Sequence, residues 1–417
     1  MCNRLPRLWF LSFLFTISVV IGCASPFQPH PLEEVRFQER SQTQDDGQFR
    51  VTASVLSADE TQAVFGFALY KKGVQPIWLE IENKDDEPTW FLPYSVDPDY
   101  FPPLEVTYPY HRTFDSEYND QIDRYFLDLA MGIYLAPGSV RSGFVFTNLD
   151  LGTKSFNIDL VGDDNQPHTF TFFIAVPGLR SDHQDIDFDN LYSASEQVSY
   201  NADNFRKALG ELPCCVTNKD GTKFGAPINF VIVADEETLL RVLIRAGWNE
   251  TATTNTTSSS KKKISSDIPQ DLRYKSVAPL YYYGRQQDAS FREPRAAGFE
   301  RNKLRLWLSP IRFEGQAVWV GQINRDYGKR SSERMNRKID LDEARSFFLQ
   351  NLWYAQGLKR YGFVKGAGSD SSIDQPKTTF RGSTYITDGY RAVLWLSAEA
   401  VPLSEIEALE WDLPPER

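Results

Sequence analysis

Residues 304–322 read LRLWLSPIRFEGQAVWVGQ, and this stretch predicts the fold of the C-terminal half. Segments 304–308 and 317–322 are rich in Leu, Val and Trp, which favour strands. Glu314 and Gly315 lie between the segments and supply turn residues. Two strands joined across this turn are therefore expected.

Helix and strand signals surround this pair. Asp235 is placed to cap a helix that begins with Glu236 and Glu237, and Gly247 is placed to close it. A second helix is expected over residues 341–355, with Asp340 and Glu343 spaced as a capping box. The expected strands cover residues 228–233, 277–283, 361–364 and 392–396. Two helices against several strands predict an α+β domain with a mixed sheet over residues 204–397.

Two segments of this half carry weaker patterns. Residues 249–263 are rich in Thr, Ser and Lys, which predicts a surface loop without regular structure. Residues 398–417 are expected to form a C-terminal tail.

The preceding half favours strands. Residues 49–56, 63–69, 77–83, 142–146, 155–160 and 169–176 are short strand candidates separated by Gly, Pro, Asp and Asn. One helix is expected around residues 122–129, where apolar side chains recur at helical spacing. We therefore expect an antiparallel β-sandwich of immunoglobulin-like type over residues 48–177, followed by an acidic linker over residues 178–203.

The first residues are predicted to form a secretion signal. Arg4 and Arg7 precede an apolar run over residues 8–21, which is shorter than the roughly twenty residues that span a bilayer. The run ends at Gly22 and Cys23, a small residue before cysteine that resembles the lipobox of bacterial lipoproteins. The alternative is an ordinary signal peptide with a chance cysteine near the cleavage site.

The lipobox resemblance implies cleavage after residue 22, lipid on Cys23 and a tether over residues 23–47. Ala24, in place of Asp, favours the outer membrane over the inner one. We therefore expect a lipid-anchored protein on the periplasmic side of the bacterial envelope.

Charge divides the chain into two parts. Residues 23–189 carry 28 acidic and 11 basic side chains (28 − 11 gives net −17), whereas residues 190–417 carry 28 acidic and 32 basic ones (32 − 28 gives net +4). The difference indicates two units with different surfaces, and simple solubility explains the acidic one equally well. The sequence contains no extended basic segment of the kind that would indicate nucleic-acid binding.

Two cysteines remain after processing. Cys214 and Cys215 are adjacent in sequence and form a candidate redox pair. In an oxidising compartment they pair with each other or with another molecule. Adjacent Cα atoms lie about 3.8 Å apart, below the usual disulfide range, so a bridge between them is expected to be easily reduced.

The second half resembles a known family. The carrying segments are 212–215 (LPCC), 227–229 (PIN), 243–248 (LIRAGW), 279–288 (PLYYYGRQQD), 305–307 (RLW), 318–321 (VWVG), 325–326 (RD) and 387–389 (TDG). Together they resemble the LssY C-terminal domain family over residues 204–397. In some members this domain follows an integral-membrane lipid-phosphatase domain, which these 417 residues do not include, so that activity is not carried over.

The candidate polar site of this domain consists of Arg285, Asp288, Arg325, Asp326 and Asp388, which follow strands or lie in tight turns. The four histidines all lie before residue 190, so this domain has no Ser-His-Asp triad, Cys-His pair or histidine metal site of its own. Structural ion pairs are the competing interpretation of the five residues. No cofactor motif is present, and none is expected to bind.

A weak calcium candidate lies in the acidic linker. Counting Asp185 as position one, carboxylates fall at positions one, three, five and twelve of an EF-hand loop, through Asp187, Asp189 and Glu196. Ile186 and Phe188 alternate with the aspartates, which favours an acidic strand instead.

These observations favour a ligand- or partner-binding envelope lipoprotein over an enzyme. A small ligand or another envelope protein would be the partner. The alternative is a hydrolase of envelope lipid, phosphate or glycan substrates that uses the Asp and Arg residues of the candidate polar site.

Overall fold

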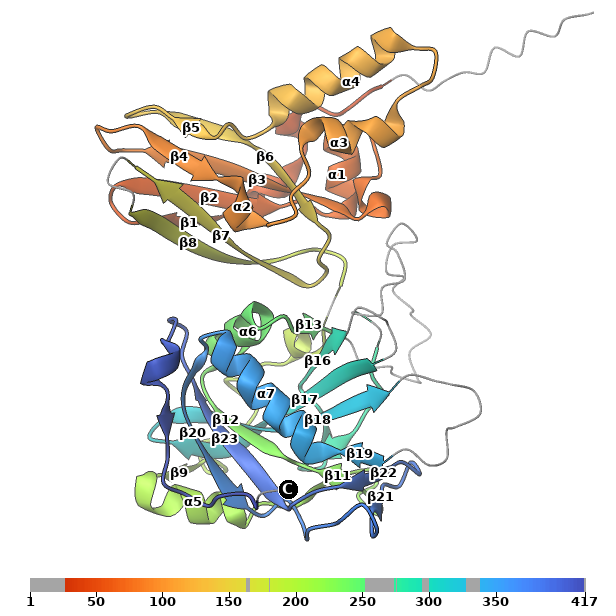
Figure 1. Cartoon of the computed structure of the whole chain (residues 1–417), viewed down its shortest axis with the longest axis vertical. Coiled ribbons are helices and arrows are strands. Elements are labelled where there is room, and N and C mark those ends of the chain that lie inside the picture. Colours follow the sequence, from red (N-terminus) through yellow and green to blue (C-terminus); the bar gives the residue numbers. More distant parts are fainter. Residues whose placement is uncertain are drawn as a thin grey trace, which may run out of the picture.

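A computed structural model describes residues 27–162, 166–179, 181–251, 274, 276–294, 300–327 and 338–415. The protein is multidomain and mostly antiparallel, with an N-terminal pair of sheets and a larger mixed sheet in the C-terminal half (Figure 1). Cys23 and most of the predicted 249–263 loop lie outside the described residues. Within the described part, no helix is long and apolar enough to cross a membrane.

The N-terminal domain contains two four-stranded sheets around one core. The first sheet has the order β1 (Gln42–Asp45), β2 (Phe49–Val55), β3 (Val74–Asn83) and β6 (Val140–Asn148). The second has the order β5 (Tyr134–Leu135), β4 (Thr89–Leu92), β7 (Thr153–Val161) and β8 (Pro167–Ala175). Buried side chains of both sheets meet, among them Val51, Ile77, Phe156 and Phe172.

Helices are more numerous here than predicted. They are α1 (Ala58–Phe65), α2 (Pro93–Val96), α3 (Pro103–Thr107) and α4 (Ser116–Leu129), of which only the last was expected. The predicted strand over residues 63–69 is wrong, because residues up to Phe65 belong to α1. Ser57 and Glu60 form a capping box at the start of α1, and Gly66 adopts a left-handed conformation at its end.

The described part of the predicted tether belongs to the folded domain. Two 3₁₀ helices cover residues Leu32–Glu34 and Arg36–Arg40. Phe37, in the second of them, is fully buried against Trp78 and Phe144 of the first sheet. Phe27 packs against Phe67 and Tyr125, with ring centroids 5.5 and 5.2 Å apart. The domain therefore begins about twenty residues earlier than the sequence indicated.

The predicted linker also packs onto folded structure. Phe188 is buried in the core of the C-terminal domain, and β9 (Val198–Tyr200) pairs in parallel with β17 (Glu300–Phe313). His183 and Glu250 meet between the domains, with 3.1 Å between His183 Nε2 and Glu250 Oε1. Glu250 also accepts a hydrogen bond of 2.6 Å from the Thr153 amide of β7.

The C-terminal domain is built on a nine-stranded mixed sheet. Its order is β13 (Asn249–Glu250), β16 (Ala289–Pro294), β17, β18 (Gln316–Tyr327), β12 (Phe230–Val233), β23 (Tyr390–Leu396), β20 (Leu358–Lys365) and β24 (Glu407–Ala408), with β9 beside β17. Among the described residues, the parallel pairs of this sheet are β9–β17, β12–β23 and β20–β24, and its other pairs are antiparallel. The predicted hairpin is the antiparallel β17–β18 pair.

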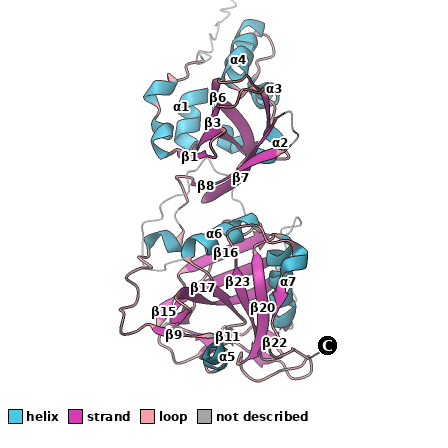
Figure 2. Cartoon of the chain, turned by 90° about the vertical axis from the view of Figure 1, so that its left-hand side faces the viewer, coloured by secondary structure: helices cyan, strands magenta, loops and turns pink. Residues whose placement is uncertain are grey.

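Three helices flank this sheet (Figure 2). Side chains of α6 (Glu236–Arg245) and α7 (Leu341–Tyr354) join the core on one face of the sheet, and side chains of α5 (Ala202–Gly210) join the core on the other. Asp235 caps α6 and Asp340 caps α7, as predicted. Glu343 pairs with Arg325 and completes no capping box.

Two small sheets lie beside the large one. One has the order β11 (Phe224–Pro227), β10 (Cys215–Thr217), β14 (Tyr281–Tyr282) and β15 (Arg285–Gln286). The other has the order β19 (Lys338–Asp340), β22 (Thr384–Ile386) and β21 (Lys377–Thr378). The predicted tail is partly packed, since Trp411 contacts Trp395 with ring centroids 5.7 Å apart.

Candidate functional site

Arg285, which is half-buried, and Asp288, which is buried, form an ion pair beside β17. Asp288 is 1% exposed and accepts a 2.6 Å hydrogen bond from the Leu308 amide. Arg285 donates to the Leu308 carbonyl at 2.5 Å and to the Tyr192 hydroxyl at 3.1 Å. Burial raises the pKa of Asp288, although Arg285 acts in the opposite direction. Both side chains are thus engaged in holding the β15 turn on the sheet.

Asp388 belongs to a second, separate network. It accepts two hydrogen bonds from Arg345 of α7, at 2.9 and 2.7 Å, in the bidentate arrangement typical of strong guanidinium–carboxylate pairs. Asp342 accepts a 2.8 Å hydrogen bond from the Asp388 amide and lies 3.4 Å from Arg345. This network fastens α7 to the start of β23.

Arg325 occupies a third position. Its guanidinium donates to Asn302 at 3.2 Å and pairs with Glu343 of α7 at 2.9 Å. Side-chain contacts of Asp326 lie outside the described residues. The described members of the candidate polar site are therefore dispersed over three places, each with its own partners.

The calcium candidate has no common centre. Glu196 accepts hydrogen bonds from the amide and hydroxyl of Ser193, and Asp187 accepts from Asn190. Among the residues that the structure describes, no three His, Cys, Asp or Glu side chains gather as a metal site requires.

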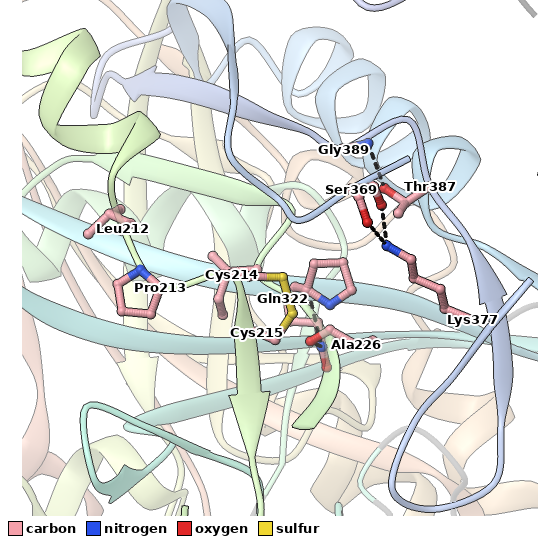
Figure 3. The surroundings of a disulfide bond; sticks show 12 residues. Leu212, Pro213, Cys214, Cys215, Ala226, Gln322, Ser369, Lys377, Thr387 and Gly389 are labelled. Atoms are coloured by element: carbon pink, nitrogen blue, oxygen red, sulfur yellow. Dashed lines mark hydrogen bonds between the residues drawn. A yellow bond between two sulfur atoms is a disulfide. The ribbon is translucent and has the colours of Figure 1, made fainter. Parts of the chain in front are cut away.

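Cys214 and Cys215 form a disulfide with each other, with Cα atoms 3.7 Å apart. Figure 3 shows this bridge between Leu212–Pro213 on one side and Ala226 with Gln322 on the other. A Cβ added to Gly368 would lie 2.8 Å from the Cys214 sulfur, so the backbone passes close to the bridge. The disulfide thus lies at the start of β10, the strand that pairs with β11.

A cavity lies on this side of the large sheet. Its volume is about 170 Å³. On β17, Lys303 and Arg305 alternate with the core residues Leu304 and Leu306 and therefore point to the opposite face. On β18 their register partners are Asn324 and Gln322. The remaining lining residues are Val216, Gly225, Ala226, Leu280, Arg325, Ile339, Leu341, Thr379, Phe380, Arg381, Ser383 and Tyr385.

Three cationic side chains dominate this basic cavity, as we call it. Arg305 is 4% exposed, Lys303 is half-buried, and Arg381 lies at the exposed rim. Arg381 donates to the Pro279 carbonyl at 2.6 Å, and burial lowers the pKa of its guanidinium. No carboxylate is found among the described residues that line the cavity. Arg325 borders it, but its guanidinium is directed to Asn302 and Glu343 as described above.

Gln322 fixes the floor of the basic cavity. Its amide nitrogen donates to the carbonyls of Ala226 and Pro227, at 2.9 and 3.3 Å, so β18 and β11 are held together below the cations. The arrangement places positive charge in a small recess with a rigid base. Such a recess can hold a compact anion, because the guanidinium and ammonium groups are strong donors to carboxylate and phosphate oxygens.

Of the residues that line the cavity, sequence reasoning selected Arg325 for the candidate polar site but not Lys303, Arg305 or Arg381. Lys303 and Arg305 carry one signal, because two cations alternate with leucines on a strand whose next residue of the same phase is the buried Trp307. Cations followed by a buried aromatic on one face of a strand indicate that the first part of this face lines a polar site and the second part packs in the core. Arg381 gives no comparable signal, since it lies in a loop far along the chain.

Comparison with known families identifies the domain that contains the cavity. Residues 207–390 match the family model described as LssY C-terminus. The C-terminal domain matches the LssY C-terminal family. The resemblance inferred from the sequence is thus confirmed, and every residue that lines the basic cavity falls inside the matched stretch of this LssY C-terminal domain. No curated protein matches the chain.

Proposed function

We propose that the protein is an envelope lipoprotein whose LssY C-terminal domain binds a small anionic ligand in the basic cavity. The cluster of Lys303, Arg305 and Arg381 around a closed base carries this proposal. Leu280 and Phe380 add apolar walls, which suit a ligand with an anionic group and a small apolar part.

The anchored part of the proposal rests on the first 23 residues. The basic start, the short apolar run and Gly22-Cys23 support lipid attachment at Cys23 and a place on the periplasmic face of the outer membrane. We also propose that the N-terminal pair of sheets is an immunoglobulin-like sandwich, which two antiparallel sheets around one core support.

The hydrolase alternative receives less support. Asp288 and Asp388 each have an arginine partner and lie in separate networks, so neither is available beside the basic cavity. Proton transfer requires a group within hydrogen-bond reach of the substrate. A binding module therefore agrees better with the described geometry.

Calorimetry with inorganic phosphate tests the binding proposal. Arg305→Met keeps much of the apolar packing of the side chain but removes its charge. We expect the dissociation constant for phosphate to rise at least about tenfold, since one charge-assisted hydrogen bond is worth about 1.5–3 kcal/mol. Arg206→Met is the matched control, because Arg206 on α5 pairs with Asp412 and does not line the cavity. Equal affinity in wild type and Arg305→Met would refute the proposal.

The anchor has its own test. Cys23→Ala removes the acylated thiol, so the variant is expected in the aqueous phase after detergent partitioning while the wild type enters the detergent phase. A variant that still partitions into detergent would refute lipid attachment at Cys23.

A further inference from the structure

The N-terminal domain carries exposed aromatic and aliphatic side chains where α3 leads into α4. Phe114 is 100% exposed, Tyr108 is 75% exposed and Leu104 is 49% exposed. They lie within eleven residues of one another, in α3, in the following 3₁₀ helix Tyr108–Tyr110 and just before α4. We call these three side chains the apolar tip.

The start of the described chain lies against the same helix. Phe27 packs on Tyr125 of α4, and Phe27 with Ser116 and Glu117 lines one open cavity of about 760 Å³. Ser116 follows Phe114 by two residues. Figures 1 and 2 show α4 at the end of the N-terminal domain that points away from the C-terminal domain.

Chain geometry limits the distance between Cys23 and this end. Four residues from Cys23 to Phe27 span at most about 14 Å when fully extended. A lipid on Cys23 would lie in the bilayer, so Phe27 and the Tyr125 side chain of α4 on which it packs would be held close to the headgroups. The cavity that Phe27 lines is bordered by Ser116 as well, so the apolar tip, whose Phe114 is two residues before Ser116, lies at the end of the domain that would face the membrane.

We propose that the apolar tip docks on the lipid surface and sets the orientation of the protein, with the LssY C-terminal domain directed away from the membrane. This inference rests on the proposed lipid anchor at Cys23. Tyr and Phe are suited to the membrane–water interface, where an amphipathic or apolar ring enters the headgroup region.

The preferred surface is electrically neutral. Residues 23–189 carry net charge −17, and Asp115, Glu117 and Asp120 lie beside the tip in sequence. Anionic lipids would repel this domain, whereas zwitterionic headgroups would not. Contact therefore depends on apolar burial and not on charge attraction.

The test uses the full lipidated chain in phosphatidylcholine–phosphatidylethanolamine vesicles. Phe114→Cys and, separately, Tyr108→Cys carry a polarity-sensitive dye, and Phe224→Cys, a 66%-exposed position in β11, is the matched control. Dyes at 108 and 114 are expected to shift to the blue on reconstitution and to be quenched by spin-labelled lipid, while the dye at 224 keeps its aqueous spectrum. Vesicles enriched in phosphatidylglycerol should give a smaller shift.

Flotation of the vesicles separates the two proposals. Protein that floats while the dyes at 108 and 114 report water would overturn the docking proposal and leave the anchor standing. Protein that does not float would overturn both. A blue shift already present in the acyl-free Cys23→Ala chain in buffer would mean that protein covers the tip, and would also overturn the docking proposal.

Discussion

Replacing Arg391 by methionine should destabilise the LssY C-terminal domain strongly. The Arg391 side chain on β23 is fully buried, and its guanidinium donates to four backbone carbonyls. The acceptors are Ile228 at 3.0 Å, Leu209 at 2.6 Å, Leu212 at 3.2 Å and Pro213 at 2.9 Å. Burial lowers the pKa of this guanidinium.

These contacts fasten the end of α5 and the turn before Cys214 to the central strands. Leu209 belongs to the last turn of α5, where the Glu211 amide satisfies the carbonyls of Lys207 and Ala208 and Arg391 satisfies that of Leu209. Arg391→Met leaves four buried acceptors without their donor. Each buried carbonyl left without its donor costs about 1–3 kcal/mol, and the relief of not burying the guanidinium charge offsets part of the sum. We expect a loss of about 3 kcal/mol.

Urea unfolding followed by tryptophan fluorescence measures this loss. Arg206→Met on the same α5 helix is the control, because its pair with Asp412 is half-exposed and such pairs contribute about 0–1 kcal/mol. A free energy of unfolding for Arg391→Met within about 1 kcal/mol of wild type, at an unchanged denaturant slope, would refute the reasoning.

Two further predictions concern packing and pH. Gly321→Ala should cost at least about 2 kcal/mol, because the added Cβ would collide with the Phe230 ring; Tm by calorimetry checks this, and an unchanged Tm would contradict the packing. Glu250 gives the pH prediction: burial would raise its pKa, but the hydrogen bond and charge of His183 and the bond from Thr153 outweigh burial and lower it. Because its pKa is lower in the folded state, ionised Glu250 contributes its full stabilisation at pH values above the unfolded pKa of 4.5. This contribution is lost as the pH falls through the folded-state pKa. The Tm difference between wild type and Glu250→Gln should therefore be present at pH 7 and shrink below pH 4.5, and a pH-independent difference would contradict this assignment.

The sequence predicted the elements whose signals are local. The 304–322 hairpin, the α6 and α7 caps and the strands β2, β3, β6, β7 and β8 follow from alternation, capping residues and turns, whereas β1, β4 and β5 were not predicted. The strand predicted over residues 63–69 failed because a short apolar run suits a helix equally well. Ser57, Glu60 and Gly66 decide that ambiguity through their caps.

The candidate site was less accessible to sequence reasoning. Arg285, Asp288, Arg325 and Asp388 were selected by type and turn position, but pairing with Leu308, Glu343 and Arg345 is set by tertiary packing. The basic cavity joins Arg305 to Arg381, which are distant in sequence and meet only after β22 pairs with β19, which in turn contacts β18. Only the alternation of Lys303 and Arg305 with leucines was visible beforehand.

The most direct test of the central claim is an anomalous difference map from crystals of the protein soaked in tungstate, an oxyanion that stands in for phosphate. The account predicts a peak in the basic cavity, within hydrogen-bond reach of Arg305 and Lys303, and its loss in Arg305→Met crystals. Peaks elsewhere with an empty cavity, or a cavity peak that persists in Arg305→Met, would contradict anion binding by these side chains.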